Sequence, residues 1–168
     1  MGKADHEGQA KGMGPIPYAV IAVSDSRTEE TDESGRLVVS LLDEAGHQQR
    51  GRVLIRNDVP AIQAEVRRWL EAGARLVVLA GGTGAGRRDL TVEAVRPLLD
   101  KELEGFGELF RALSFQEIGA TAMLSRALLG VNRGRAILCL PGSTAAIRLA
   151  LSKLLIPELH HLLWVAGR

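Results

Sequence analysis

The feature that most constrains the fold is an uninterrupted apolar run, Leu76-Val77-Val78-Leu79. Such a run leaves no side of a strand for water, so it is typical of a strand that is covered on both faces. A glycine-rich segment, residues 81–88, follows directly. A parallel sheet between two layers of helices is the expected setting, because its connecting helices lie on both faces.

The rest of the chain alternates between short β-rich runs and longer helical stretches. Strands are predicted at 16–23, 47–55, 75–80, 127–131 and 136–140, the last two as a hairpin around Asn132-Arg133-Gly134. Helices are predicted at 34–45, 60–72, 91–95 (with Thr91 as the N-cap), 105–115, 116–124 and 143–155. This alternation predicts an α/β fold of three layers, with a mostly parallel central sheet.

The length and the net charge of the chain limit the number of domains and the classes of partner that we expect. Its 168 residues suit one domain, predicted at 15–168 behind a flexible N-terminal tail at 1–14. The net charge of +1 gives no reason to expect nucleic acid or an anionic membrane as the main partner. One cysteine, Cys139, excludes an internal disulfide, and its apolar surroundings favour a core position. With no apolar run of about 18 residues, the chain is expected in the cytoplasm.

The glycine-rich segment is the first candidate for chemistry. Glycines after a buried strand let backbone N–H groups face outward, where they bind phosphate. The dinucleotide-binding pattern fails, because Arg87 stands where a third glycine is needed after Gly82 and Gly84. A P-loop fails as well, because Arg87-Arg88 replaces the lysine and hydroxyl residue. The segment therefore predicts an anion-binding loop of another kind, with a plain strand-to-helix turn as the alternative.

Other loops should lie beside it, because ligands in such folds bind beyond the carboxyl ends of the strands. This rule points to residues 24–34 and 141–143 as well as 81–89. Pro141-Gly142-Ser143 opens a helix, where free N–H groups favour an anion. Ser125 and Arg126 precede the hairpin and are further candidates for anion contact. For Arg126, a surface ion pair is the alternative.

Two carboxylates follow strands and are candidates for metal binding. Asp58 follows the second predicted strand, and Asp89 follows the two arginines of the glycine-rich segment. Magnesium is often held by one or two carboxylates together with substrate phosphates. The alternatives are an N-cap for Asp58, and a helix N-terminal or arginine contact for Asp89.

In these residues the sequence resembles the MoaB/MogA family of molybdenum cofactor biosynthesis proteins, which includes the gephyrin G domain. The family signature is an apolar strand, Gly-Gly-Thr-Gly, four residues and Asp, matched here by residues 81–84 and Asp89. Further matches lie at 32–35, 104–111, 117–119, 125–127 and 140–143. The blocks at 104–108 and 117–119 look more like the B branch, and the resemblance runs from about residue 16 to 159.

The resemblance implies a MogA-like molybdopterin-binding fold and a reaction. Active relatives adenylylate molybdopterin with ATP and Mg²⁺ and release pyrophosphate. Asp58 and Asp89 match the acidic positions on which that reaction depends, and they are our candidate catalytic residues and magnesium ligands. The candidate pterin- and nucleotide-binding residues are Ser24, Asp25, Gly81, Gly82, Thr83, Gly84, Ser125, Arg126, Pro141, Gly142 and Ser143.

Two other functions stay open from the sequence. One is a non-catalytic molybdopterin-binding or scaffold protein of the same pathway, and the other is a nucleotide-binding module unrelated to pterins. The resemblance also implies a homotrimer or homohexamer that works with other cofactor-biosynthesis proteins. The apolar residues 162–165 are a candidate subunit contact.

Overall fold

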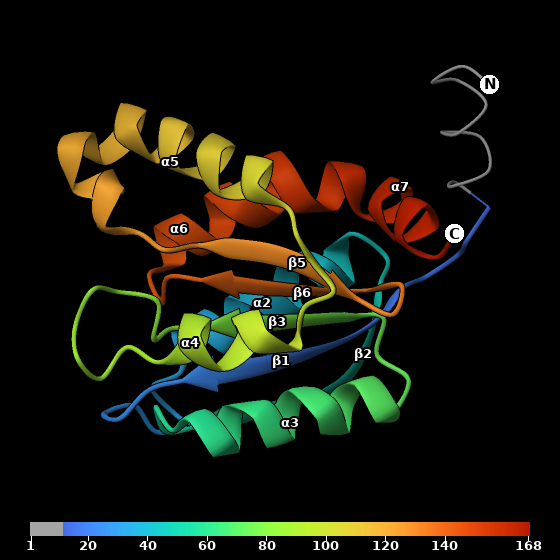
Figure 1. Cartoon of the computed structure of the whole chain (residues 1–168), viewed down its shortest axis with the longest axis horizontal. Helices are drawn as coiled ribbons and strands as arrows, with labels where there is room; N and C mark the ends of the chain where they lie inside the picture. Colours follow the sequence, from blue (N-terminus) through green and yellow to red (C-terminus); the bar gives the residue numbers. More distant parts are fainter. Residues whose placement is uncertain (1–11) are drawn as a thin grey trace.

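A single six-stranded sheet organises the molecule, shown in Figure 1 as a computed structural model that describes residues 12–168. The strand order is β2-β1-β3-β6-β5-β4. The first four strands of this order pair in parallel, whereas β5 runs antiparallel to β6 and β4 antiparallel to β5. The strands are β1 Pro17–Val23, β2 Gln48–Ile55, β3 Leu76–Ala80, β4 Lys101–Glu102, β5 Leu128–Asn132 and β6 Arg135–Leu140.

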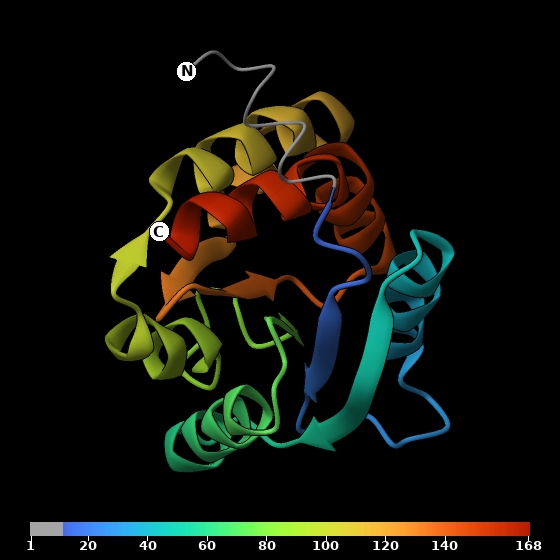
Figure 2. The ribbon, with the colours of Figure 1, turned by 90° about the vertical axis from the view of Figure 1, so that its right-hand side faces the viewer.

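Helices cover both faces of the sheet, as Figure 2 shows from the side. One face carries α2 Glu33–Glu44, α5 Glu104–Ile118, and the consecutive helical segments α6 Thr144–Ala150, η3 Leu151–Leu155 and α7 Ile156–Ala166. The other face carries α3 Val59–Glu71 and α4 Thr91–Val95, the latter continued by η1 Arg96–Leu98. A further short helix, η2 Gly119–Leu124, follows α5. The three-layer α/β fold is therefore confirmed.

The residues of β3 show why the apolar run demanded two helical layers. All five of its residues are buried. Leu76, Val78 and Ala80 pack in the core beside α2 and α6, while Val77 and Leu79 pack in the core beside α3 and α4. Successive side chains of a strand point to opposite faces, so each layer of the core takes alternate residues of the run.

Several predicted helices differ from the structure in their bounds or caps. Residues 104–118 form one continuous helix, where the sequence predicted two helices that meet at 115 and 116. This helix ends at Gly119, which has a φ of +64°. The last helix continues past 155 to Ala166 through the π-helical turn η3. That wider turn ends two residues before Pro157, which has no N–H to donate to the preceding turn. Thr91 is the first residue of α4 and not its N-cap, which is Leu90.

The strand β4 has no counterpart in the sequence prediction. It consists of two exposed residues, Lys101 and Glu102, which pair with Val131 and Gly130 of β5. Two charged residues carry no periodic pattern, so only the proximity of β5 makes them a strand.

The helix 144–166 is long and apolar enough to cross a membrane, by length and composition alone. It packs instead against the sheet with the buried side chains of Ile147, Leu151, Leu155, Leu159 and Leu163. These residues follow one another at intervals of four, so they form one continuous stripe on the helix. We therefore interpret it as a core helix of the domain.

The chain leading into β1 is held by two histidines. The predicted tail, 1–14, lies outside the described residues except for 12–14. Of these, Gly14 offers its carbonyl oxygen to Nε2 of His160, 2.9 Å away. Nδ1 of His47 accepts a hydrogen bond from the backbone N–H of Ile16 at 3.3 Å. The rings of His47 and His160 lie 5.3 Å apart.

Burial, together with the nearby His160 ring, lowers the pKa of His47. His47 therefore binds a proton more readily in the unfolded chain than in the folded protein. Protonation of the unfolded chain lowers the free energy of unfolding, and this loss is absent only above the unfolded pKa of about 6.5. We expect the free energy of unfolding to fall as the pH drops from 7 to 5, measured by urea denaturation. His47→Asn keeps an acceptor near Ile16 but does not titrate, so it should flatten this slope. An unchanged slope in that variant would assign the acid sensitivity to other groups.

Candidate functional site

Three loops meet where parallel strands β1, β3 and β6 end, as the sequence predicted. They are residues 24–27, 81–89 and 141–143. The N–H of Gly81 donates to the carbonyl oxygen of Leu140 at 2.9 Å, and the Arg27 guanidinium donates to the carbonyl oxygen of Gly142 at 3.2 Å. A Cβ on Gly142 would lie 3.4 Å from the Cα of Gly81. The loops are therefore in close backbone contact.

The glycine loop begins with two residues whose conformation requires glycine. Gly81 and Gly82 have φ values of +106° and +66°. A Cβ on Gly81 would lie 2.2 Å from the carbonyl oxygen of Val23. Thr91 holds both residues, since its hydroxyl donates to the Gly81 carbonyl oxygen at 2.7 Å and its N–H to that of Gly82 at 3.0 Å. A left-handed backbone in such close contact excludes a side chain.

An apolar hollow of about 280 Å³ lies on the α5 side of the glycine loop. Phe110 and Ala146 line its inner wall, and Ile118 and Leu124, both more than half exposed, line its rim. The Oγ of Ser125 is buried at this hollow without a hydrogen-bond partner among the described residues. Apolar walls with a few convergent polar groups suit a flat ring system. The other lining residues are Gly82, Thr83, Gly84, Asp89, Ser114, Pro141, Gly142 and Ser143.

A polar hollow of about 350 Å³ lies on the other side of the same loop. The Asp25 carboxylate accepts a hydrogen bond from the N–H of Asn57 at 3.0 Å and forms an ion pair with Arg88 at 2.8 Å. Gly82, Asp89 and Gly142 line this hollow as well as the apolar one. The two hollows are therefore neighbours that share the glycine loop as a wall. Ser24, Ser26, Arg27 and Gly81 also line the polar one.

Asp89 lies at the junction of the two hollows. Its Oδ2 accepts a hydrogen bond from the N–H of Gly86 at 2.9 Å, and the same oxygen would lie 2.6 Å from a Cβ on Gly84. Its Oδ1 accepts no hydrogen bond from residues 12–168. The alternative of a contact with Arg87 or Arg88 is not observed within residues 12–168, where Arg88 pairs with Asp25 and no ion pair joins Arg87 to Asp89. Asp89 thus has one carboxylate oxygen free for a ligand.

Asp58 lies elsewhere. It is the N-cap of α3, and its Oδ2 accepts a hydrogen bond from the N–H of Ala61 at 2.9 Å. It is exposed and lines neither hollow. Its Oδ1 accepts no hydrogen bond from the described part of the chain. Within residues 12–168 there is no cluster of three or more acidic, histidine or cysteine residues for a metal.

Arg126 forms hydrogen bonds with the glycine loop and with α4, and it also lines a charged cavity. Its guanidinium donates to the carbonyl oxygens of Gly84 and Asp89, at 2.9 and 3.1 Å, and pairs with Glu93 of α4. The hydrogen bond from Arg126 lowers the pKa of Glu93. The sequence alternative of an ion pair is therefore observed, with loop contacts that the sequence did not predict.

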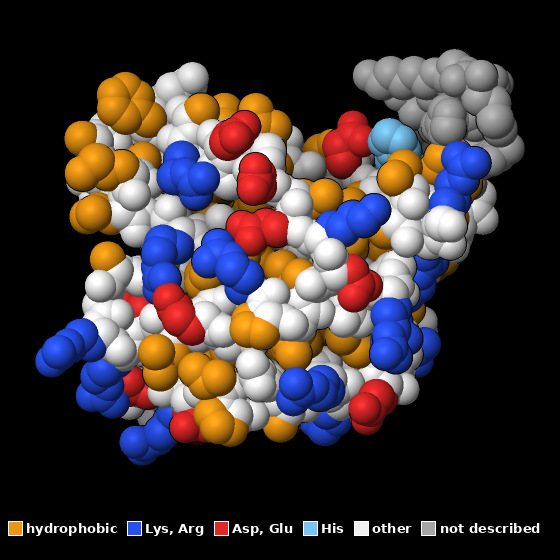
Figure 3. All heavy atoms as spheres, in the orientation of Figure 1, with side chains coloured by type: hydrophobic (Ala, Val, Ile, Leu, Met, Phe, Trp, Pro, Cys, Tyr) orange, Lys and Arg blue, Asp and Glu red, His pale blue; other side chains and the backbone are white. Residues whose placement is uncertain are grey.

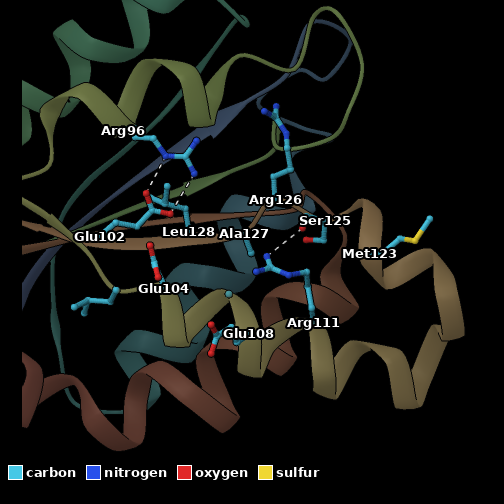
Figure 4. A pocket seen from close by; sticks show the side chains of 12 residues that line it. Arg96, Glu102, Glu104, Glu108, Arg111, Met123, Ser125, Arg126, Ala127 and Leu128 are labelled. Carbon is cyan, nitrogen blue, oxygen red and sulfur yellow. Dashed lines mark hydrogen bonds and ion pairs between the residues drawn. The ribbon is translucent and has the colours of Figure 1, made fainter.

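A third, charged cavity of about 440 Å³ lies behind the segment that carries Ser125 and Arg126. Figure 4 shows the Arg96–Glu102 ion pair on one side and Arg111 of α5 directed at the Ser125 carbonyl on the other. Sequence reasoning missed this cavity, since all of its charged residues except Arg126 come from η1, β4 and α5. It also missed Asn57, although the strand-end rule that found Asp58 applies equally to its neighbour.

Residues 19–161 match the family model described as a probable molybdopterin binding domain. The chain belongs to this family. The match includes all three loops and every strand of the sheet except the first two residues of β1. The resemblance to the MoaB/MogA group is confirmed.

Curated relatives of this family member are similar over most of their length. The molybdenum cofactor biosynthesis protein B of Staphylococcus aureus strain MRSA252 is 45% identical over 151 residues, covering 88% of this chain and 90% of its own. The protein of the same name from Bacillus subtilis strain 168 is 44% identical over 163 residues, covering 96% and 95%.

Solved structures of the family share the fold. The tungsten cofactor synthesizing protein MoaB from Pyrococcus furiosus superposes with a TM-score of 0.84 at 34% identity, over 92% of this chain and 98% of its own. A crystal structure of molybdenum cofactor biosynthesis protein B gives a TM-score of 0.87 at 44% identity, over 92% and 97%.

Proposed function

We propose that this protein acts in molybdenum cofactor biosynthesis, in the cytoplasm, and transfers an adenylyl group from ATP to molybdopterin. The observation that carries the proposal is the position of the glycine loop and Asp89 between an apolar and a polar hollow. Transfer of an adenylyl group from one substrate to the other needs adjoining binding sites, with anion-binding groups at their junction. The names of the relatives support the pathway.

The reaction joins two anions, so the work of the protein is positioning and charge neutralisation. An oxygen of molybdopterin attacks the α-phosphorus of ATP, the bond from that phosphorus to the bridging oxygen breaks, and pyrophosphate leaves with the electron pair. When bound, Mg²⁺ supplies positive charge to the phosphates. We propose Asp89 and, through its free oxygen, Asp58 as the residues that hold it.

The remaining candidates divide between the two hollows. We propose that the apolar hollow takes the pterin, with Thr83 and Ser125 as polar contacts beside Phe110 and Leu124. Ser24 and Asp25 line the polar hollow, which we assign to the nucleotide. The backbone of residues 81–84 and 141–143 lies between them and faces the phosphates.

The decisive test supplies the purified protein with molybdopterin, ATP and Mg²⁺. We expect adenylylated pterin and pyrophosphate in equal amounts, at a rate that depends on both substrates. ATP turnover without pterin would instead indicate a nucleotide-binding module of another kind.

One observation favours the alternative of a binding or scaffold protein without catalysis. Asp58, one of the two acidic positions that the reaction is expected to need, lines neither hollow. Pterin binding at the apolar hollow without product formation would establish that alternative.

We also propose that the protein is a homo-oligomer, a trimer or a hexamer. Figure 3 shows apolar side chains gathered at the corner formed by α5 and η2. Leu109, Phe115, Ile118, Met123 and Leu124 are all more than half exposed there. In the expected contact at 162–165, Leu163 is buried in the core and only Val165 is exposed. An apolar surface of this extent marks an interaction site, and sedimentation of the full chain measures the assembly.

A further inference from the structure

Arg126 bridges the two ends of the loop that carries Asp89. Its Nε donates to the carbonyl oxygen of Gly84 at 2.9 Å, and its Nη2 to that of Asp89 at 3.1 Å. The peptide unit is planar and trans, so its C=O and N–H groups point in opposite directions. Turning the Gly84 carbonyl toward the guanidinium therefore turns the N–H of Ala85 away from it. The same guanidinium fixes the backbone of Asp89, whose carboxylate lines both hollows.

Glu93 holds the guanidinium in this orientation. Both of its carboxylate oxygens accept from Arg126, one of them at 3.2 Å from Nη2. The pair is partly exposed, with 34% of the Arg126 side chain and 47% of the Glu93 side chain accessible. An exposed ion pair by itself contributes little to stability. The planar fork of arginine, however, sets the direction of every bond that it makes.

We propose that Arg126 is a positioning residue, held by Glu93, which fixes the 84–89 loop and Asp89 for an anionic substrate without binding that substrate itself. The part of this inference that concerns the anionic substrate rests on the proposed function. The part that concerns the geometry of the 84–89 loop does not. Figure 4 shows the Arg126 side chain at the edge of the charged cavity, directed away from Arg96, Glu102 and Arg111.

Two conservative substitutions separate this role from direct anion binding. Glu93→Gln removes a negative charge near the loop, so it would strengthen anion binding if Arg126 acted through its charge. If Arg126 acts through the geometry of the loop, the same change loosens its orientation and weakens binding. Arg126→Lys keeps the positive charge but loses the fork, so only the positioning role predicts a loss.

The chain offers a matched control. Arg96 and Glu102 form a similar two-bond ion pair in the same region, at 2.8 and 3.2 Å, and neither contacts the glycine loop. Glu102→Gln therefore removes the same charge and the same kind of pair without touching Gly84 or Asp89.

The experiment measures two quantities on the full chain: amide hydrogen exchange of the peptide containing residues 84–89, and the dissociation constant for ATP with Mg²⁺. A charge-assisted hydrogen bond corresponds to roughly tenfold or more in an equilibrium. We expect Arg126→Lys and Glu93→Gln each to speed loop exchange and weaken ATP binding about tenfold. Glu102→Gln should change neither quantity.

Three results would overturn the proposal: unchanged loop exchange in both variants, tighter ATP binding by Glu93→Gln, or an equal effect of Glu102→Gln. If the wild-type protein binds no ATP, the proposed function fails. The exchange measurement alone then decides the role of Arg126, because it needs no ligand.

Discussion

Replacement of Asp89 by Asn is expected to slow adenylyl transfer by about 10²–10³-fold, the usual cost of removing one electrostatic group from such a site. The amide keeps an oxygen that accepts from Gly86 N–H, so the turn should persist. The negative charge at the junction of the two hollows is lost, and with it the strongest candidate ligand of Mg²⁺. Pyrophosphate release with molybdopterin and ATP measures the effect.

Asp58→Asn is the matched comparison, because asparagine caps a helix as well as aspartate does. The cap bond to Ala61 should survive, and with it the stability of α3. A rate loss beyond about tenfold would support Asp58 as a second ligand, by the usual cost of disturbing a metal site. Wild-type rates in both variants would remove the carboxylates from the proposed mechanism.

Replacement of Gly81 by Ala should cost about 3 kcal/mol or more of stability, from backbone strain and overpacking together. At a φ of +106° the new Cβ would lie 2.2 Å from the carbonyl oxygen of Val23. The backbone at Gly81 cannot easily shift to remove this collision. Its N–H donates a hydrogen bond to the Leu140 carbonyl oxygen, and its own carbonyl oxygen accepts one from the Thr91 hydroxyl. Urea denaturation measures the loss.

Gly73→Ala separates strain from collision. Gly73 has a φ of +90°, and a Cβ there would meet nothing within 4 Å. Only the conformational cost of a left-handed residue remains, about 1–2 kcal/mol. Equal losses of unfolding free energy in the two variants would show that Val23 moves away from the new Cβ at little cost. The close approach of the two loops would then not be the reason that position 81 requires glycine.

The main elements were predictable because each has a local cause. The apolar run at 76–80 demanded two helical layers, and Gly46 and Gly73 ended the helices before them. The strand β4 was not predictable, because its pairing with β5 depends on a distant segment. The last helix was predicted too short, because the π-helical turn that accommodates Pro157 has no simple sequence signal.

The candidate site shows the same division. The strand-end rule pointed to the loops at 24–34, 81–89 and 141–143, because parallel strands end at one edge of a sheet. Of the first loop, residues 24–27 line the polar hollow beside the other two. The rule selects loops rather than the directions of side chains. Asp58 and Asn57 both follow β2, yet Asn57 lines the polar hollow while Asp58 caps α3.

The three-layer fold, the edge of the sheet that carries the site, and the glycines in close backbone contact there could all be predicted from the amino-acid sequence. They follow from hydrophobic periodicity and from conformations open only to glycine, which are properties of short segments. The contacts of Arg126 with Glu93 and with the carbonyl oxygens of Gly84 and Asp89 form only when the packed elements bring these residues together. Those contacts span more than 30 residues of chain, and a long side chain chooses its partners only after the elements have packed.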